Sequence, residues 1–123
     1  MAELNSPSLI DAEILEGLRE LTSDDDPQFV KRYFTAFLDG LPAHFAGVRD
    51  ALRTNDARRL ATHAHAIKSS CANSGVVEMT ERCGKIEAMG HAGDTSQALP
   101  LVEEIEALHK QLEAEVRALP EMN

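Results

Sequence analysis

The chain has few aromatic residues, no Trp and no long apolar run. Aromatic side chains make up only 4% of its 123 residues. A β-sandwich normally contains more aromatic and β-branched residues, whereas Ala and Leu, which are plentiful here, favour helices. Hydrophobic residues still reach 43%, which is enough to bury a core. These proportions predict an all-α protein, and the length is typical of a single domain spanning 1–123.

Signals for export or membrane insertion are also missing. No apolar stretch approaches the ~18 residues of a membrane span, and the first residues lack the basic-then-apolar order of a signal peptide. We therefore expect a cytoplasmic protein without membrane contact, and the start at Met1 favours a free-standing protein. Cys71 and Cys83 are the only cysteines. We interpret both as reduced core residues, with a structural disulfide as the alternative.

Positive charge is scarce overall but concentrated in one region. The net charge of −9 argues against general nucleic-acid binding. Residues 49–85 nevertheless contain seven Lys or Arg and four Asp or Glu, whereas the rest of the chain contains five and seventeen. Such clustering arises by chance on solvated helix faces. The alternative is a docking surface for an acidic partner or a site that tolerates an anion.

Apolar residues recur at helical spacing in the first half of the chain. Residues 1–6 are expected to form a flexible tail, and a first helix is expected to begin near Ser8. The next helix is predicted to start with Asp26 as its N-cap and Pro27 at its first position. The sequence DGLP at 39–42 then predicts a break or kink before the helical pattern resumes.

Three more helices are expected in the second half. The first runs from about 57 to 74, and the last, which has the clearest periodicity, from about 98 to 119. The candidate caps and terminators are, in chain order, Asn55 or Asp56, Gly75, Gly90, Asp94 or Thr95, and Pro120. Short connections between amphipathic helices predict an antiparallel four-helix bundle with an additional N-terminal helix.

The segment LATHAHAIKSSCANSG, residues 60–75, places two histidines in one predicted helix. At about 100° per residue, a buried seam is formed by Leu60, Ala64, Ile67 and Cys71. His65 lies off this seam, and Lys68 follows it by three residues on a neighbouring part of the surface. Small residues surround His65 at helical spacing: Ala61, Ser69 and Ala72. We therefore expect His65 to be exposed and open to the backbone of a partner.

The histidines are not expected to bind a metal ion. His63 lies about 200° from His65 around the helix, so the two cannot hold one metal from one face. We interpret His63 as a half-buried residue at the bundle edge, and His44, His91 and His109 as ordinary surface residues. The sequence therefore predicts no metal site.

Hairpin geometry gives His65 a candidate neighbour. If the chain turns at Gly75, His65 lies ten residues before the turn and Glu87 twelve after it. At ~1.5 Å rise per residue the two lie at similar heights. Glu87 could accept a hydrogen bond from one imidazole nitrogen, which would fix the tautomer and leave the other nitrogen as the nucleophile. A solvated glutamate on a polar face is the alternative.

An exposed imidazole beside a lysine is suited to phosphoryl chemistry. One imidazole nitrogen is unprotonated near neutral pH and is a good nucleophile. A phosphoryl group brings about −2 of charge, which Lys68 can partly offset. The sequence shows no Gly-rich phosphate loop, no carboxylate pair for a metal and no Ser/His/Asp set. We therefore predict a phosphoryl carrier without its own ATP site, and not an enzyme in the ordinary sense.

The segment AHAIKSSCANSG resembles the signature of histidine-containing phosphotransfer (HPt) domains. That signature is a histidine, any residue, an aliphatic, Lys, usually Gly, then Ser or Ala, with a Gly further on. The matching residues are His65, Ile67, Lys68, Ser70 and Gly75. The resemblance extends to IDAEILEGLREL, DDPQFVKRYFTAFLDGLPAHFAGVRDALRTND and CGKIEAMG, and so covers most of the chain. Ser69 departs from the usual Gly, which affects the expected docking geometry more than the chemistry.

The resemblance implies a phosphorelay intermediate in two-component signalling. His65 would accept a phosphoryl group from the phospho-aspartate of one receiver domain and pass it to the aspartate of another. Glu87 falls where family members often carry Glu or Gln. The implied partners are response-regulator receivers, which would supply Mg²⁺, and a hybrid sensor histidine kinase; the chain itself would need no cofactor. The expected docking surface comprises Arg58, Ala61, Ser69, Ser70 and Ala72.

Two other functions remain open. A non-catalytic helical adaptor would bind receivers without phosphotransfer, although such a protein would be expected to lose the histidine first. A fragment of an autophosphorylating kinase would depend on a nucleotide-binding segment that the sequence does not show. We expect a monomer.

Overall fold

The computed structural model describes residues 8–123, and the predicted tail at 1–6 lies outside them. The described helices are α1 (Ala12–Glu20), α2 (Phe29–Arg53), α3 (Ala57–Asn73), α4 (Val77–His91), α5 (Leu99–Arg117) and the short 3₁₀ helix η2 (Pro120–Met122). Over this part of the chain, no helix combines the length and the hydropathy needed to cross a membrane.

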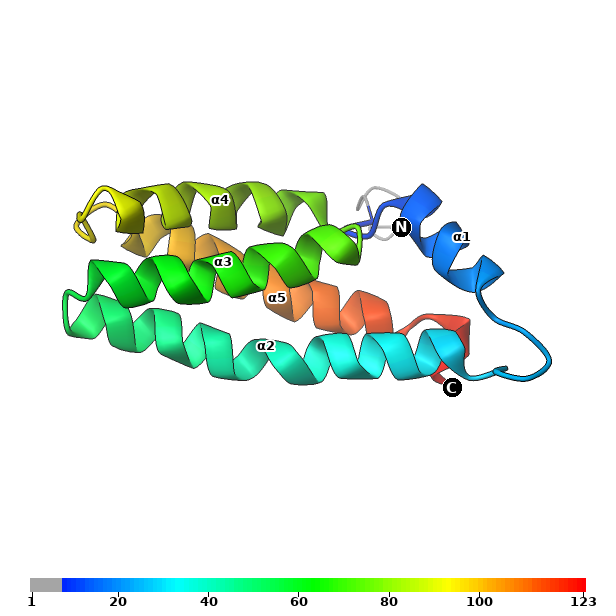
Figure 1. Cartoon of the computed structure of the whole chain (residues 1–123). Coiled ribbons are helices and arrows are strands. Elements are labelled where there is room, and N and C mark those ends of the chain that lie inside the picture. Colours follow the sequence, from blue (N-terminus) through cyan, green and yellow to red (C-terminus); the bar gives the residue numbers. More distant parts are fainter. Residues whose placement is uncertain (1–7) are drawn as a thin grey trace.

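Four of these helices form an antiparallel bundle. Helices α2 to α5 run alternately in opposite directions along a common axis (Figure 1). Helix α1 lies at one end of the bundle, close to the turn between α3 and α4 (Figure 1). Just before α1, Leu9 and Ile10 are buried, and the Asp11 N–H donates to the Gly75 carbonyl at 2.7 Å. The predicted all-α four-helix bundle with an additional N-terminal helix is confirmed.

The core is built from one apolar stripe on each bundle helix. The predicted seam of α3 is 0% exposed along its whole length: Leu60, Ala64, Ile67 and Cys71. It joins one core cluster that includes Phe34 and Leu41 of α2 and Met79 of α4. Burying each large side chain stabilises the fold by about 1.5–3 kcal/mol. Because this seam fixes the rotation of α3 about its axis, His65, about a quarter turn from Ala64, faces solvent.

Both cysteines are buried and unbridged. Burial raises the pKa of Cys71 and of Cys83 to about 12, so each thiol stays protonated at neutral pH. The interpretation as reduced core residues is confirmed, and the alternative of a disulfide is wrong.

The turn between α3 and α4 depends on Gly75. Its φ of 77° lies in the left-handed region that favours glycine. A Cβ at this position would also come within 2.8 Å of the Ile14 Cβ. Two hydrogen bonds close the turn, from the Gly75 N–H to the Ala72 carbonyl and from the Val76 N–H to the Cys71 carbonyl. The predicted helix terminator is confirmed, and it sets α3 and α4 side by side.

The first two helices begin later than predicted, and the second has no break. Asp11, not Ser8, caps α1, because its side chain accepts from the N–H groups of Glu13 and Ile14. Asp26 does not cap α2; it pairs with Arg32 at 2.6 Å, and the helix starts after Gln28. These are corrections to the predicted caps.

Of the two alternatives predicted near residues 39–42, the break is wrong, because α2 continues through Pro42, and the kink stays a prediction. A proline inside a helix costs about 3 kcal/mol. Here the buried stripe runs on from Leu41 before the proline to Phe45 and Val48 after it. Burial of this continuous face outweighs the local cost.

Among the later caps, Asp56 is confirmed, and α5 ends at Arg117, before Pro120, as predicted, whereas the predictions for Asp94, Thr95 and Gly90 differ from the structure. The Asp56 side chain accepts from the Arg59 N–H at 3.1 Å. Neither Asp94 nor Thr95 caps α5, since Ala98 holds that position and Asp94 bonds to Ser96 instead. Helix α4 also continues one residue past Gly90, which lies inside the helix and not after it.

Candidate functional site

His65 lies on the solvent-facing stripe of α3. Its side chain is 59% exposed, whereas Ala64 beside it is fully buried. The stripe contains Arg58, Thr62, His65, Ser69 and Ala72, spaced at intervals of three and four residues. The predicted exposure of His65 is confirmed. Its imidazole is accessible to a partner without any movement of the bundle.

Glu87 of α4 contacts the imidazole from the side. The Nδ1 of His65 lies 2.9 Å from the Glu87 Oε2. The Glu87 side chain is only 13% exposed, because it lies in the α3–α4 interface and not on an open polar face. The contact inferred from hairpin geometry is therefore present, and the alternative of a solvated glutamate does not describe this residue.

Lys68 binds the other oxygen of the same carboxylate. Its Nζ lies 2.6 Å from the Glu87 Oε1. The lysine stem crosses α4 where Gly84 has no side chain: a Cβ there would lie 3.8 Å from the Lys68 Cδ. The expected pairing of Lys68 with His65 is thus indirect in the unphosphorylated protein. Both groups meet at Glu87.

The charge state of Glu87 determines which imidazole nitrogen is free. The hydrogen bond from Lys68 is the largest cause that lowers the pKa of Glu87 to about 2, followed by bonds from His91 and His65. Glu87 is therefore a carboxylate at neutral pH and can only accept. The Nδ1 of His65 must then carry the proton that it donates, which leaves the Nε2 lone pair available.

A groove beside His65 is open along the α3–α4 junction. It is lined by Ala57, Arg58, Ala61, Thr62, His65, Glu87, Gly90, His91 and Gly93. The two helices approach closely here because Gly90 has no side chain. A Cβ on Gly90 would lie 2.7 Å from the Ala57 carbonyl oxygen and from the Ala61 backbone nitrogen. The groove gives a partner access to one side of the imidazole.

The predicted docking residues do not share one face. Arg58, Ser69 and Ala72 are exposed on the His65 stripe. Ala61 is only 4% exposed, because Gly90 packs against it, but it lines the groove beside His65. Ser70 is half-buried in a different hollow between α2 and α3, beside Tyr33 and Phe37.

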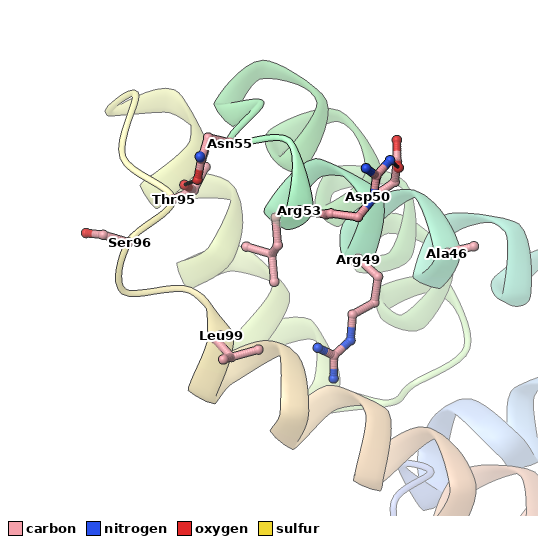
Figure 2. A pocket seen from close by; sticks show the side chains of 9 residues that line it. Ala46, Arg49, Asp50, Arg53, Asn55, Thr95, Ser96 and Leu99 are labelled. Carbon is pink, nitrogen blue, oxygen red and sulfur yellow. Dashed lines mark hydrogen bonds and ion pairs between the residues drawn. The ribbon is translucent and has the colours of Figure 1, made fainter.

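A second groove lies at the opposite side of the bundle end, between α2 and the start of α5. Figure 2 shows its lining side chains, with Arg49 and Arg53 on α2 and Leu99 on α5. Both arginines are already paired, Arg49 with Glu106 at 2.6 Å and Arg53 with Asp50. This groove contains none of the predicted site residues, and its cations are neutralised by neighbouring carboxylates.

His63 and His44 form a pair that the sequence did not reveal. Their Nδ1 atoms lie 3.1 Å apart across α2 and α3. The His63 ring lies over Gly47, where a Cβ would come within 2.5 Å of the ring. The half-buried position of His63 agrees with the interpretation from the sequence. His44, in contrast, is not an ordinary surface residue, because it pairs with His63. His109 is not one either, since its ring stacks on Phe45 with centroids 4.6 Å apart.

His91 and Thr62 are site residues that sequence reasoning missed. His91 follows Glu87 by four residues, so its ring reaches the same carboxylate, at 3.3 Å from Nε2 to Oε2. Thr62 precedes His65 by three residues on the exposed stripe. Both spacings were visible in the sequence as i, i+4 and i, i+3 relations. Within residues 8–123, no set of three or more His, Cys, Asp or Glu side chains is arranged to hold a metal.

Comparisons with known proteins place the chain in a family. The family model of the Hpt domain matches residues 32–119. A curated relative, multistep phosphorelay regulator 1 of Schizosaccharomyces pombe, is 26% identical over 87 residues, which are 71% of this chain and 30% of that protein. The chain thus spans less than a third of that relative.

A solved structure shares the fold. The histidine-containing phosphotransfer protein B (HptB) of Pseudomonas aeruginosa PAO1 matches with a TM-score of 0.81 and 22% identity, over 91% of this chain and 94% of that one. Since the Hpt model covers well over half of the sequence, the chain belongs to the Hpt domain family.

Proposed function

We propose that the Nε2 of His65 accepts a phosphoryl group from the phospho-aspartate of a receiver domain and passes it to the aspartate of a second receiver. One observation supports this assignment above all. The Nδ1 of the exposed imidazole is hydrogen-bonded to the mostly buried carboxylate of Glu87, and its Nε2 is free.

The transfer step balances without a change of protonation at His65. The Nε2 lone pair attacks phosphorus as the bond between phosphorus and the aspartate oxygen breaks, and the aspartate leaves as a carboxylate. The ring keeps its Nδ1 proton and becomes a phosphoimidazolium. Its positive charge faces the Glu87 carboxylate, 2.9 Å from Nδ1, which stabilises it. The reverse step delivers the phosphoryl group to the next receiver.

Lys68 is proposed to offset the charge of the transferred group. Its ammonium has three donors, and one of them is used on Glu87 at 2.6 Å. The side chain is 34% exposed, so the remaining donors are accessible from solvent. In the phosphorylated state the ammonium can keep Glu87 and bind a phosphoryl oxygen.

Receivers are proposed to dock on the exposed stripe of α3 and the adjoining groove. Small side chains at Ser69 and Ala72 let a partner approach the ring, and the exposed Arg58 complements an acidic receiver pocket. The divalent metal ion of the reaction belongs to the receiver in this proposal. A hybrid sensor kinase is the proposed upstream source of the phosphoryl group, and the chain has no proposed ATP chemistry of its own.

Label transfer from a phosphorylated receiver tests the assignment. The wild-type protein should acquire an acid-labile, alkali-stable label, and 31P NMR should place it on the imidazole Nε2. The variant His65→Gln should lose acceptance at least about a thousandfold, because its amide has no nucleophilic lone pair on nitrogen. His65→Gln accepting label at the wild-type rate would overturn the site. Receiver binding by the wild type without any label would support the adaptor alternative instead.

A further inference from the structure

His91 contacts Glu87 from the end of α4. It is the last residue of that helix, and its Nε2 lies 3.3 Å from the Glu87 Oε2. Because Glu87 is a carboxylate, with a pKa of about 2, the Nε2 of His91 must be the donor. His91 also lines the groove beside His65. It is 70% exposed, so its position is not explained by core packing.

Two hydrogen-bond donors on α3, Lys68 and His65, compete for the orientation of the Glu87 carboxylate. Lys68 contacts Oε1 at 2.6 Å, and His65 contacts Oε2 at 2.9 Å. The ammonium carries a full charge, so it attracts both oxygens more strongly than a neutral imidazole does. The terminal torsion of a glutamate is broad and weakly restrained. With only these two partners, the carboxylate can rotate toward Lys68 and away from His65.

A second donor on Oε2 opposes that rotation. His91 and His65 both bind Oε2, one from α4 and one from α3. Together they hold this oxygen on the groove side of Glu87, while Lys68 holds the other oxygen.

We propose that His91 is a positioning residue for phosphoryl transfer: it holds the Glu87 carboxylate in the orientation that keeps the proton of His65 on Nδ1. The inference rests on the proposed role of His65 as acceptor. Its chemistry is confined to hydrogen bonding, so His91 neither touches the phosphoryl group nor exchanges a proton with it.

The tautomer of His65 gives a readout that does not depend on phosphotransfer. Long-range 1H–15N NMR spectra of the unphosphorylated full chain, recorded where imidazoles are neutral, distinguish Nδ1–H from Nε2–H rings. The variant His91→Leu, which lacks the donor, should show a visible share of the Nε2–H form at His65. His91→Gln keeps an N–H donor and should resemble the wild type. His44→Leu, the same change at a histidine outside the groove, is the matched control and should leave the His65 signals in place.

Transfer rates from a phosphorylated receiver supply the second readout. His91→Leu should slow transfer about two- to tenfold, the effect expected for one hydrogen bond, and His91→Gln should recover the rate to within about twofold. A His65 spectrum in His91→Leu that superimposes on the wild type overturns the inference, whatever the rate. If the wild type accepts no label at all, the proposed function fails and the role of His91 in transfer fails with it, while the spectra still decide whether His91 fixes the tautomer of His65.

Discussion

His63 and His65 lie two residues apart on α3 and have opposite surroundings. His65 is exposed and donates to a carboxylate, whereas half-buried His63 shares a hydrogen bond with a second imidazole, His44. A carboxylate can only accept, so it determines which nitrogen of His65 carries the proton. Two imidazoles can place the shared proton on either ring. The partner supplied by the neighbouring helix, more than the residue type, decides which of the two histidines suits the proposed role of phosphoryl acceptor.

The largest expected difference between the two regions is in the transfer rate after the hydrogen-bond partner of His65 or of His63 is removed. Glu87→Ala should slow phosphoryl transfer about 10- to 100-fold, the range seen when the group that orients a functional imidazole is lost. His44→Ala should leave transfer within about twofold of wild type, because His63 has no part in the proposed chemistry. Single-turnover label transfer from a phosphorylated receiver measures both rates.

Glu87→Gln serves as the conservative control, since its amide oxygen still accepts from Nδ1. It should fall between the wild type and Glu87→Ala. Equal rates for Glu87→Ala and His44→Ala would mean that the carboxylate does not orient His65.

The sequence predicted the His65 region better than the His63 region for a geometrical reason. The exposure of His65 follows from a rotation of 100° per residue within one helix, and the height of Glu87 follows from rise along a hairpin with a known turn. The pairing of His44 with His63 depends on where α2 crosses α3, which no local pattern specifies. Pairwise packing of this kind emerges only from the assembled core.

Two other errors have the same origin in packing between helices. The predicted break at 39–42 followed from the proline, but the buried stripe on both sides of it keeps α2 continuous. Ala61 was expected in the docking surface because it is small and lies near His65 along α3, but its side chain is only 4% exposed. It is buried because Gly90 lets α4 approach at that point. Local propensity was outweighed by tertiary contacts in both cases.

Gly90, beside the His65 region, and Gly47, beside His63, should differ in how much substitution by alanine lowers the free energy of unfolding. In Gly90→Ala the Cβ would lie 2.7 Å from backbone atoms of Ala57 and Ala61, which cannot move without separating α3 from α4. We expect a loss of about 1–3 kcal/mol in the free energy of unfolding.

In Gly47→Ala the three atoms nearest to the added Cβ all belong to the His63 ring. The ring can swing outward, and alanine improves the helix by up to about 1 kcal/mol, so the net loss should be smaller. Urea unfolding followed by circular dichroism measures both variants. A Gly47→Ala protein less stable than Gly90→Ala would show that the His63 ring is held more rigidly than the α3–α4 contact.

The smallest expected effects lie in the pH dependence of stability, where the two regions act in different ranges. Burial, with help from His44 and Arg59, lowers the pKa of His63 below 6.5. Its contribution to stability is therefore present above pH 6.5 and is lost as the pH falls through the lowered value, because the unfolded chain binds the proton first. Glu87, with a pKa lowered from 4.5 to about 2, contributes above pH 4.5 and loses that contribution toward pH 2.

Urea unfolding between about pH 7.5 and pH 3 should therefore separate the two histidine regions. His63→Gln should flatten the decline in stability just below pH 6.5, with the remaining slope due to His109, whose pKa burial also lowers. Glu87→Gln should leave that range unchanged and flatten the decline below pH 4.5. If His63→Gln changed only the acid range, protonation of His63 would not be what lowers the stability just below pH 6.5.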